Sequence, residues 1–244
     1  MLPYERKKII EDFIDQNGET TIDDICALDL DVSASTVRRD LKTLENEGII
    51  SVYYGGIVKK NKYYVEQKIE NKRMTNREAK TRIAKYAAKL VKPDETIFLD
   101  SGSTVAEMIT YLDPTVKIVT TSIDIVMNNV NQLEIYLLGG YVSDVRNSVY
   151  GISTIRQLED FVFEKAFLGA NGISEKYGIT TPSLEESMLK KNVIKSSSKV
   201  YFLIDNSKIG NFSTCKISEV DENHVIMDEE NHLTEMYQNI AFPE

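Results

Sequence analysis

The sequence contains few of the residues that form disulfide frameworks and metal sites. Its 244 residues include two cysteines, Cys26 and Cys215, two histidines, His224 and His232, and no tryptophan. Because two cysteines so far apart are too few for a disulfide framework or a metal-binding motif, we expect two reduced structural thiols. We predict neither a metal site nor a cofactor.

Long apolar runs are missing as well. No apolar stretch approaches the ~20 residues that a membrane-spanning helix needs, and the first ten residues, MLPYERKKII, lack the apolar centre of a signal peptide. We therefore expect a cytoplasmic protein without a membrane partner. With 42% hydrophobic residues the chain can bury a sizeable core, and its length allows one large domain or two ordinary ones.

Positive charge is in deficit over the whole chain, whose net charge is −9, but it is concentrated in one region. Residues 1–58 hold six basic and twelve acidic side chains, residues 59–92 hold twelve and three, and residues 93–244 hold eleven and twenty-three. Since locally placed cations neutralise phosphates, the negative total does not exclude a nucleic acid as partner. It predicts binding that is sensitive to salt.

One helical pattern combines clear ends with a cationic face. Ser33 is a good N-cap and Gly48 suits the position just past the helix end. Val37, Leu41 and Leu44 form an apolar stripe at i, i+4 and i+7, and this spacing turns most polar side chains outward. We predict a DNA-recognition helix in the major groove of double-stranded DNA. Its predicted DNA contacts are Ser33, Ser35, Thr36, Arg38, Arg39 and Lys42.

The neighbouring segments favour this interpretation. A short helical pattern at 21–28 and the connection at 29–32 form a helix-turn-helix with it. Residues 49–58 contain two β-prone runs around a glycine pair and predict a small hairpin or wing, while 3–16 predict a supporting first helix. Taken alone, an arginine pair on a helix is more typical of a solvated face.

Four sequence features carry a family resemblance: Arg6 with Ile9, VSASTVRRDL at 32–41, LENEGII at 44–50 and YGG at 54–56. They resemble the winged helix-turn-helix of the DeoR family of bacterial transcription regulators. The wing of that family often carries arginines and a histidine before the glycine pair, whereas this chain has Ser51, Val52 and Tyr54 there. The resemblance implies a DNA-binding domain over residues 1–58.

The polar, lysine-rich stretch 59–76 has no clear apolar period and predicts an interdomain linker. Its Lys59, Lys60 and Lys62 are candidates for contacts with flanking phosphates, and a merely solvated linker is an equally good interpretation. A long helix is expected at 77–91, where the second domain, 77–244, begins.

The second domain alternates apolar strands with helices, which predicts a parallel sheet covered on both faces. The expected strands are 96–99, 116–120, 135–138, 165–168 and 200–204, with 225–227 as a weaker addition. The expected helices between them are 105–112, 123–131, 152–161 and 184–196. Small, hydroxyl-bearing and acidic residues follow the strands, at the edge of the sheet where ligands bind.

The first of these loops, Asp100–Thr104, presents backbone N–H groups and hydroxyls at a predicted helix start, which suits a phosphate. Lys208 offers a cation, and Asp100 and Asp205 can accept from sugar hydroxyls. A turn that only caps a helix, a surface lysine and local turn caps are the alternatives. We predict a phosphorylated sugar or polyol as the ligand. The candidate binding residues are Asp100, Ser101, Gly102, Ser103, Thr104, Thr121, Gly139, Gly140, Asn171, Asp205 and Lys208.

This half also resembles the DeoR-family sensor domain, whose relatives by fold include ribose-phosphate isomerases and coenzyme A transferases. The matching stretches are REAKTRIAKYAA at 77–88, IFLDSGST at 97–104, IVTTS at 118–122, LLGG at 137–140, FLGANGIS at 167–174, GITTPSLEESMLKK at 178–191 and FLIDNSKIG at 202–210. The resemblance implies that the loop at 100–104 and Lys208 hold the phosphate of a sugar-phosphate inducer. It also implies that Glu185 lies near the hydroxyl end of that ligand.

An isomerase-like enzyme is the rival hypothesis. Isomerases of this fold place aspartates around the loop that corresponds to GANG, where this chain has Leu168 and Asn171, and an amide cannot act as a general base. His224 and His232 lie outside every predicted loop of the crevice. We therefore predict no catalytic residue and favour a repressor of a carbohydrate-use operon. Since one recognition helix reads few base pairs, we expect a homodimer or homotetramer on paired half-sites.

Overall fold

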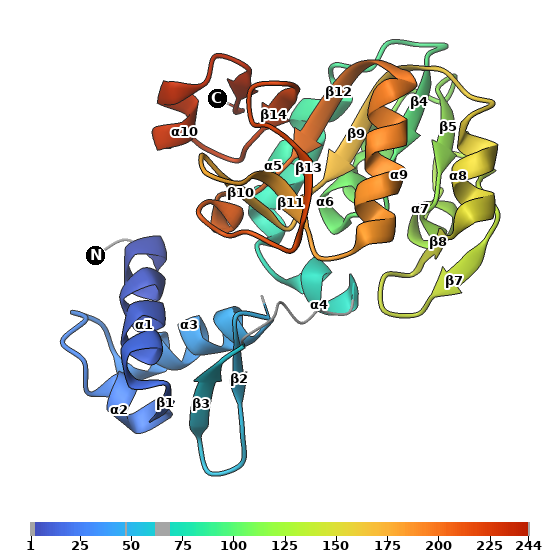
Figure 1. Ribbon diagram of the computed structural model, residues 1–244. Coiled ribbons are helices and arrows are strands. Elements are labelled where there is room, and N and C mark those ends of the chain that lie inside the picture. Colours follow the sequence, from blue (N-terminus) through green and yellow to red (C-terminus); the bar gives the residue numbers. More distant parts are fainter. Residues whose placement is uncertain (1–2, 47, 62–68, 244) are drawn as a thin grey trace. The chain divides into compact units, whose positions relative to one another are not determined.

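The computed structural model describes residues 3–46, 48–61 and 69–243. The chain divides into two compact units, Met1–Thr75 and Asn76–Glu244. The first unit is a helix-turn-helix with a wing, and the second is an α/β domain built on a parallel sheet (Figure 1). The fold class therefore agrees with the one predicted from the sequence.

The first unit packs three helices against a small antiparallel sheet of order β1-β3-β2. The helices are α1 (Pro3–Asn17), α2 (Ile22–Cys26) and α3 (Ala34–Asn46), the strands are β1 (Glu19–Thr21), β2 (Ile50–Val52) and β3 (Ile57–Lys60), and a fourth helix, α4 (Ile69–Met74), follows. The expected stripe of α3 is buried: Val37, Leu41 and Leu44 are at most 2% exposed. Burial of each such side chain contributes about 1.5–3 kcal/mol, so this stripe fixes which face of α3 points outward.

The second helix is shorter than predicted. It begins only at Ile22, because the hydroxyl of Thr21 accepts from the backbone N–H of Asp24 while the Asp24 carboxylate accepts from the N–H of Thr21. The residues before it pair with β3 as strand β1. This strand overlaps the expected helix 21–28 only at Thr21, and it forms through a partner far along the chain.

The boundary of the wing also differs from the prediction. Strand β3 continues through Lys59 and Lys60, which were assigned to the linker, because pairing with β1 and β2 uses backbone groups and needs no apolar side chain. Part of the remaining linker, residues 69–74, is helical as α4. Lys62 lies outside the described residues.

The second unit contains a seven-stranded sheet of order β15-β14-β12-β9-β4-β5-β6, in which every neighbouring pair is parallel. Its strands are β4 (Thr96–Leu99), β5 (Lys117–Thr120), β6 (Glu134–Leu137), β9 (Phe163–Gly169), β12 (Ser197–Leu203), β14 (His224–Ile226) and β15 (Ile240–Ala241). The chain moves from β4 outward to β6, returns to β9 beside β4, and continues to the other edge. The strand order therefore reverses between β4 and β9.

Helices cover both faces of this sheet (Figure 1). They are α5 (Arg77–Ala88), α6 (Ser103–Ala106) with the 3-10 turn η1 (Glu107–Tyr111), α7 (Ile123–Met127), α8 (Ile152–Leu158), α9 (Leu184–Lys195), η2 (Asn206–Lys208) and α10 (His232–Met236). The expected helix 105–112 is thus a short α-helix that tightens into a 3-10 turn, and the expected helix 123–131 ends at Met127.

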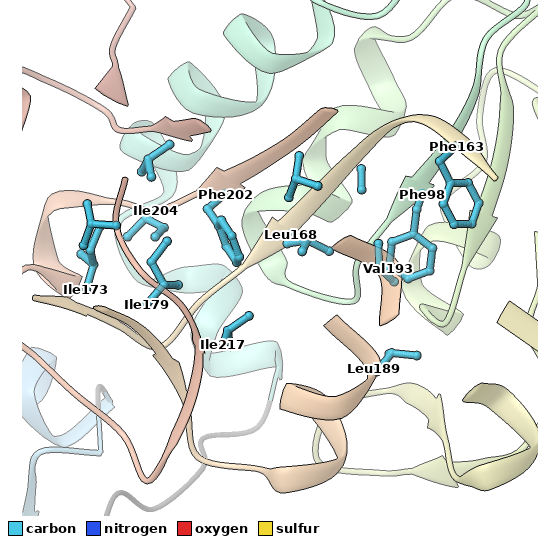
Figure 2. Packing of buried hydrophobic residues seen from close by; sticks show 14 of the residues in the cluster. Phe98, Phe163, Leu168, Ile173, Ile179, Leu189, Val193, Phe202, Ile204 and Ile217 are labelled. Atoms are coloured by element: carbon cyan, nitrogen blue, oxygen red, sulfur yellow. The ribbon is translucent and has the colours of Figure 1, made fainter. Parts of the chain in front are cut away.

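Alternate side chains of each strand enter different cores, as two-residue periodicity requires. Phe98, Leu168 and Phe202 pack with α9, whereas Ile97 and Phe167 face α5 and α6. Figure 2 shows Phe98, Leu168 and Phe202 in one row with side chains from α9. Burial on both faces explains why the strands are visible in the sequence as continuous apolar runs.

Two further sheets were not predicted. Strands β10 (Gly172–Ser174), β11 (Gly178–Thr181) and β13 (Cys215–Ser218) form an antiparallel sheet, and β7 (Tyr141–Ser143) pairs with β8 (Ser148–Tyr150) as a hairpin. These strands are three or four residues long, too short for their residue pattern to identify them. β7 with β8 and β10 with β11 are local hairpins, whereas β13 joins β11 from a segment far along the chain.

Candidate functional site

The outward face of α3 carries the predicted DNA contacts. Ser33, Ser35, Arg38, Arg39 and Lys42 are exposed, and Thr36 is half-buried. Arg38 lies 3.5 Å from an Asp23 oxygen and Lys42 lies 2.9 Å from a Glu45 oxygen. Exposed pairs of this kind are worth about 0–1 kcal/mol, so they hold the cations only weakly against a competing phosphate or base.

Hydrogen bonds fix the start of α3. The Ser33 hydroxyl accepts from the backbone N–H of Thr36, and it lies 2.8 Å from the Ser35 hydroxyl and 3.0 Å from the Thr36 hydroxyl. The structure thus places Ser33 at the N-terminus of α3 as a cap. Three hydroxyls thus gather beside the N–H groups of the first turn of α3, a position that suits an anion.

A buried ion pair that the sequence did not reveal orients α3. The Arg6 guanidinium of α1 donates to both oxygens of Asp40, at 2.5 and 3.2 Å, and both residues are buried. The hydrogen bond from Arg6 to Asp40 is the main cause that raises the pKa of Arg6. Because Asp40 lies on the same helix as Arg38 and Arg39, this ion pair links α1 to the helix that carries the exposed arginines.

The wing presents aromatic residues at its tip. Tyr54 is fully exposed, and the turn that follows uses positive φ angles at Gly55 and Gly56, which glycine adopts without strain. Lys59 forms an ion pair with Glu19 at 2.5 Å, and Lys60 pairs with Asp15. The candidate lysines thus already have acidic partners within this unit.

In the second unit, polar groups gather where the strand order reverses. The Asp100 carboxylate, just after β4, accepts from the Gly169 N–H at the end of β9 and from Lys190 Nζ of α9, both at 2.9 Å. Lys190 also donates to the Gly169 carbonyl at 3.0 Å. Asp100 and Lys190 are 2% and 3% exposed, and this buried pair ties together the two strands that flank the reversal.

A pocket opens beside this pair, and its empty space of about 380 Å³ includes open solvent. Four predicted residues line it: Asp100, Ser101, Thr121 and Glu185. The other lining residues were not predicted; they are Arg146, Ser148, Val149, Tyr150, Gly151, Thr154, Ile155, Glu186 and Leu189. They come from the β7–β8 hairpin and the starts of α8 and α9, whose approach to β4 is a long-range event.

Asp205 and Lys208 lie in a separate group at the end of β12. The strand order places this end two strands from β4, about 10 Å along the sheet. Burial disfavours the charge of Asp205, but the charges of Lys208 and Lys80 and a hydrogen bond from Asn76 outweigh it and lower its pKa. A sugar hydroxyl at Asp205 therefore has to compete with partners already in place.

The other predicted residues have structural partners. A Cβ on Gly140 would lie 2.3 Å from the Thr154 hydroxyl oxygen, so glycine is needed there for close packing. The Gly139 N–H donates to Gln157, and Asn171 bonds through its backbone and amide oxygen to Thr180 and Thr181. Gly139, Gly140 and Asn171 are not among the described residues that line the pocket.

The loop after Asp100 is tightly packed. Ser103 and Thr104 are buried in the first turn of α6, and Gly102 precedes that turn. Because α6 has only four residues, a phosphate there would be held by local N–H groups and hydroxyls and not by the dipole of a long helix.

Among the described residues, no group of three or more His, Cys, Asp or Glu side chains is arranged to hold a metal ion. No described helix is long and apolar enough to cross a membrane.

Two family models match the chain. The DeoR-like helix-turn-helix domain matches residues 6–62, and the DeoR C terminal sensor domain matches residues 75–229. The chain belongs to the DeoR family. It is accordingly a DNA-binding transcription regulator, and α3 is the second helix of the α2–α3 helix-turn-helix within the matched domain.

Curated relatives of this DeoR-family chain span nearly its whole length. The uncharacterized HTH-type transcriptional regulator FruR of Bacillus subtilis is 33% identical over 96% of this chain and 94% of its own. The HTH-type transcriptional repressor GlcR of B. subtilis is 34% identical over 91% and 86%. The lactose phosphotransferase system repressor of Staphylococcus epidermidis is 30% identical over 96% and 94%.

Among solved structures, ribose 5-phosphate isomerase A from Methanocaldococcus jannaschii is similar over 55% of each chain, with 23% identity and a TM-score of 0.40. The Pyrococcus horikoshii translation initiation factor eIF-2B is similar over 74% of this chain and 54% of that one, with 16% identity and a TM-score of 0.43. At these values the similarity does not bear on function.

Proposed function

We propose that this DeoR-family chain represses a carbohydrate-use operon, and that a phosphorylated sugar bound to its second unit controls its affinity for DNA. The observation that carries the proposal is the cluster of Asp100, Ser101 and Thr121 around a pocket at the point where the strand order reverses. Ligands of open parallel sheets bind at such points. Two relatives are named as repressors, one of them of a lactose phosphotransferase system.

In this proposal the phosphate bridges the loop at 100–104 after β4 and Lys208 at the end of β12, two strands away along the sheet. Buried hydroxyls of Ser101, Ser103 and Thr104 and the N–H groups of the α6 turn supply donors, and Lys208 supplies a positive charge. Donors together with a cation are what a phosphate dianion requires. Glu185 then lies on the side of the pocket that meets sugar hydroxyls.

Control of DNA binding requires the ligand to bind one conformation of the protein better than another, since equal affinity shifts no equilibrium. In this proposal the protein acts in the cytoplasm, where its operator DNA lies. It binds paired half-sites as a homodimer or homotetramer, because one recognition helix covers few base pairs. Sedimentation of the protein as a monomer that keeps full DNA affinity would contradict the oligomer.

Calorimetric titration of the full chain tests the ligand class. The probes are glucose 6-phosphate, fructose 6-phosphate, fructose 1-phosphate and galactose 6-phosphate, each beside its unphosphorylated sugar. We expect at least one phosphorylated compound to bind and its unphosphorylated partner to fail. Lys208→Ala should abolish that binding and leave DNA binding intact, because it removes the cation opposite the phosphate. Lys216→Ala, which removes an exposed lysine paired with Glu219, is the control and should bind normally.

The enzyme alternative is tested in the same samples. NMR spectra of the bound sugar phosphate should stay unchanged over hours, because Asn171 lacks the titratable group of a general base. Conversion of the sugar phosphate without binding to DNA would overturn the proposal in favour of an isomerase.

A further inference from the structure

Arg146 lies on the β7–β8 hairpin, but its side chain enters the pocket. Its neighbours Asp144 and Val145 are exposed, whereas the Arg146 side chain is only 16% exposed and lines the pocket with Asp100 and Ser101. A solvated surface arginine would extend away from the protein. Here the hairpin delivers a guanidinium to the carboxyl edge of the sheet.

Two contacts orient this guanidinium. Its central carbon lies 5.6 Å from the centre of the Tyr150 ring, within the range of a cation–π interaction, and Nη1 lies 3.8 Å from a Glu186 oxygen. Glu186 is in turn fixed by the Thr181 hydroxyl, which donates to the same oxygen at 2.5 Å. Residues of β8, α9 and β11 thus set the direction of Arg146.

The charges around the pocket define what Arg146 can bind. Among the described residues that line the pocket, Arg146 is the single cation, and the anions are Asp100, Glu185 and Glu186. Asp100 already accepts from Lys190 and Gly169. A phosphate dianion beside the two glutamates would be repelled, so this end of the site suits an uncharged group rich in oxygen.

We propose that Arg146 binds the unphosphorylated end of the sugar phosphate and determines which sugar is accepted. A guanidinium only donates hydrogen bonds and an ionised carboxylate only accepts them. Arg146 therefore binds a carbonyl or hydroxyl oxygen, while Glu185 accepts from a neighbouring hydroxyl. The inference rests on the proposed function and deepens it, because it assigns the sugar end of the ligand to residues that the phosphate does not contact.

The test compares Arg146→Gln and Arg146→Lys with the wild-type full chain, by calorimetry with the four sugar phosphates named above and with inorganic phosphate at millimolar concentration. We expect Arg146→Gln to weaken binding of the accepted sugar phosphate about tenfold or more, and to change binding of inorganic phosphate by less than about twofold. Arg146→Lys should recover only part of the affinity, since an ammonium lacks the planar fork of donors. Arg156→Gln, an exposed arginine of α8 outside the pocket, is the matched control.

The binding data separate the role of Arg146 from the proposed function. Unchanged binding of the accepted sugar phosphate by Arg146→Gln would overturn the inference and leave the proposed function standing. Equal loss of inorganic phosphate and sugar phosphate would also overturn it, because Arg146 would then hold the phosphate. If the wild-type protein bound none of the sugar phosphates, the proposed function would fail, and this inference with it, before any variant was compared.

Discussion

The outward face of α3 in the first unit and the buried pair beside the pocket in the second unit hold their charged residues in opposite ways. On α3 the Arg38 side chain is 60% exposed and its acidic partner 90% exposed, whereas Lys190 and Asp100 in the second unit are 4% and 3% exposed at the side chain. Exposed cations keep their hydration and exchange partners easily, which suits a surface that meets DNA phosphates. Buried charges cannot lose a partner without a large cost, which suits a rigid wall around a ligand.

The largest effect expected from this contrast is on stability at Lys190. Lys190→Met leaves the Asp100 carboxylate buried without its cation and should lower the free energy of unfolding of the second unit by about 3–5 kcal/mol. Urea denaturation followed by circular dichroism measures this change. The double variant Asp100→Asn with Lys190→Met should regain most of the loss, since neither of these two positions then carries a buried charge. A single variant as stable as the wild type would show that the pair contributes nothing.

A buried pair in the first unit provides a comparison within the DNA-binding domain. Arg6→Met leaves Asp40 without its guanidinium and should cost about 2–3 kcal/mol, less than at Lys190 because the Asp40 side chain is somewhat more exposed. DNA affinity should fall with it, because α3 loses its clamp to α1. Thermal unfolding and DNA titration of the same variant measure both effects. Full DNA affinity in a destabilised variant would show that the clamp does not orient α3.

On the exposed face of α3, a substitution should change the affinity for DNA and leave the free energy of unfolding nearly unchanged. Arg39→Ala should weaken specific DNA binding by about 1–3 kcal/mol if the side chain contacts base edges, and should change the free energy of unfolding by less than about 0.5 kcal/mol. Fluorescence anisotropy with operator DNA and urea denaturation separate the two. Lys8→Ala, which removes an exposed cation from α1, is the control. Equal DNA affinities for the two variants would contradict the role of α3.

The smallest expected effect is on stability in acid, where two buried aspartates of the second unit, Asp205 and Asp228, should behave differently. The pKa of Asp205 lies below its ordinary value of 3.8, so Asp205 contributes stability above that pH and loses it as the pH falls. Burial raises the pKa of Asp228, so its contribution has the opposite sign. Asp205→Asn should therefore flatten the loss of stability in acid and Asp228→Asn should steepen it. Urea midpoints between about pH 3 and 6 measure both slopes, and equal slopes would contradict this account.

The main sheet could be predicted from sequence because its strands are short apolar runs buried on both faces. Phe98 and Phe202 each lie in a strand that the local pattern identifies, and the order of strands and helices indicates parallel pairing. Strands such as β10 and β13 could not be predicted, because each is only three or four residues long and β13 pairs with β11, which lies far from it in the sequence.

The sequence predicts the site residues that lie in loops after strands, but not the residues that contact them from distant segments. Asp100 and Thr121 follow apolar strands and are visible as polar loop residues that line the pocket. Lys190, Arg146 and Asp40 look like ordinary charged residues on helices or turns, and their burial depends on partners far along the chain. Nothing in the local sequence distinguishes Lys190 from the exposed Lys191 beside it.

In the proposed function, a ligand of the second unit controls DNA binding by the first. The most direct test is fluorescence anisotropy of the full chain on DNA from upstream of its own gene, titrated with each sugar phosphate and its unphosphorylated sugar. We predict that one phosphorylated compound shifts the affinity for DNA and that its unphosphorylated partner does not. Specific DNA binding that no phosphorylated sugar changes would contradict the claim.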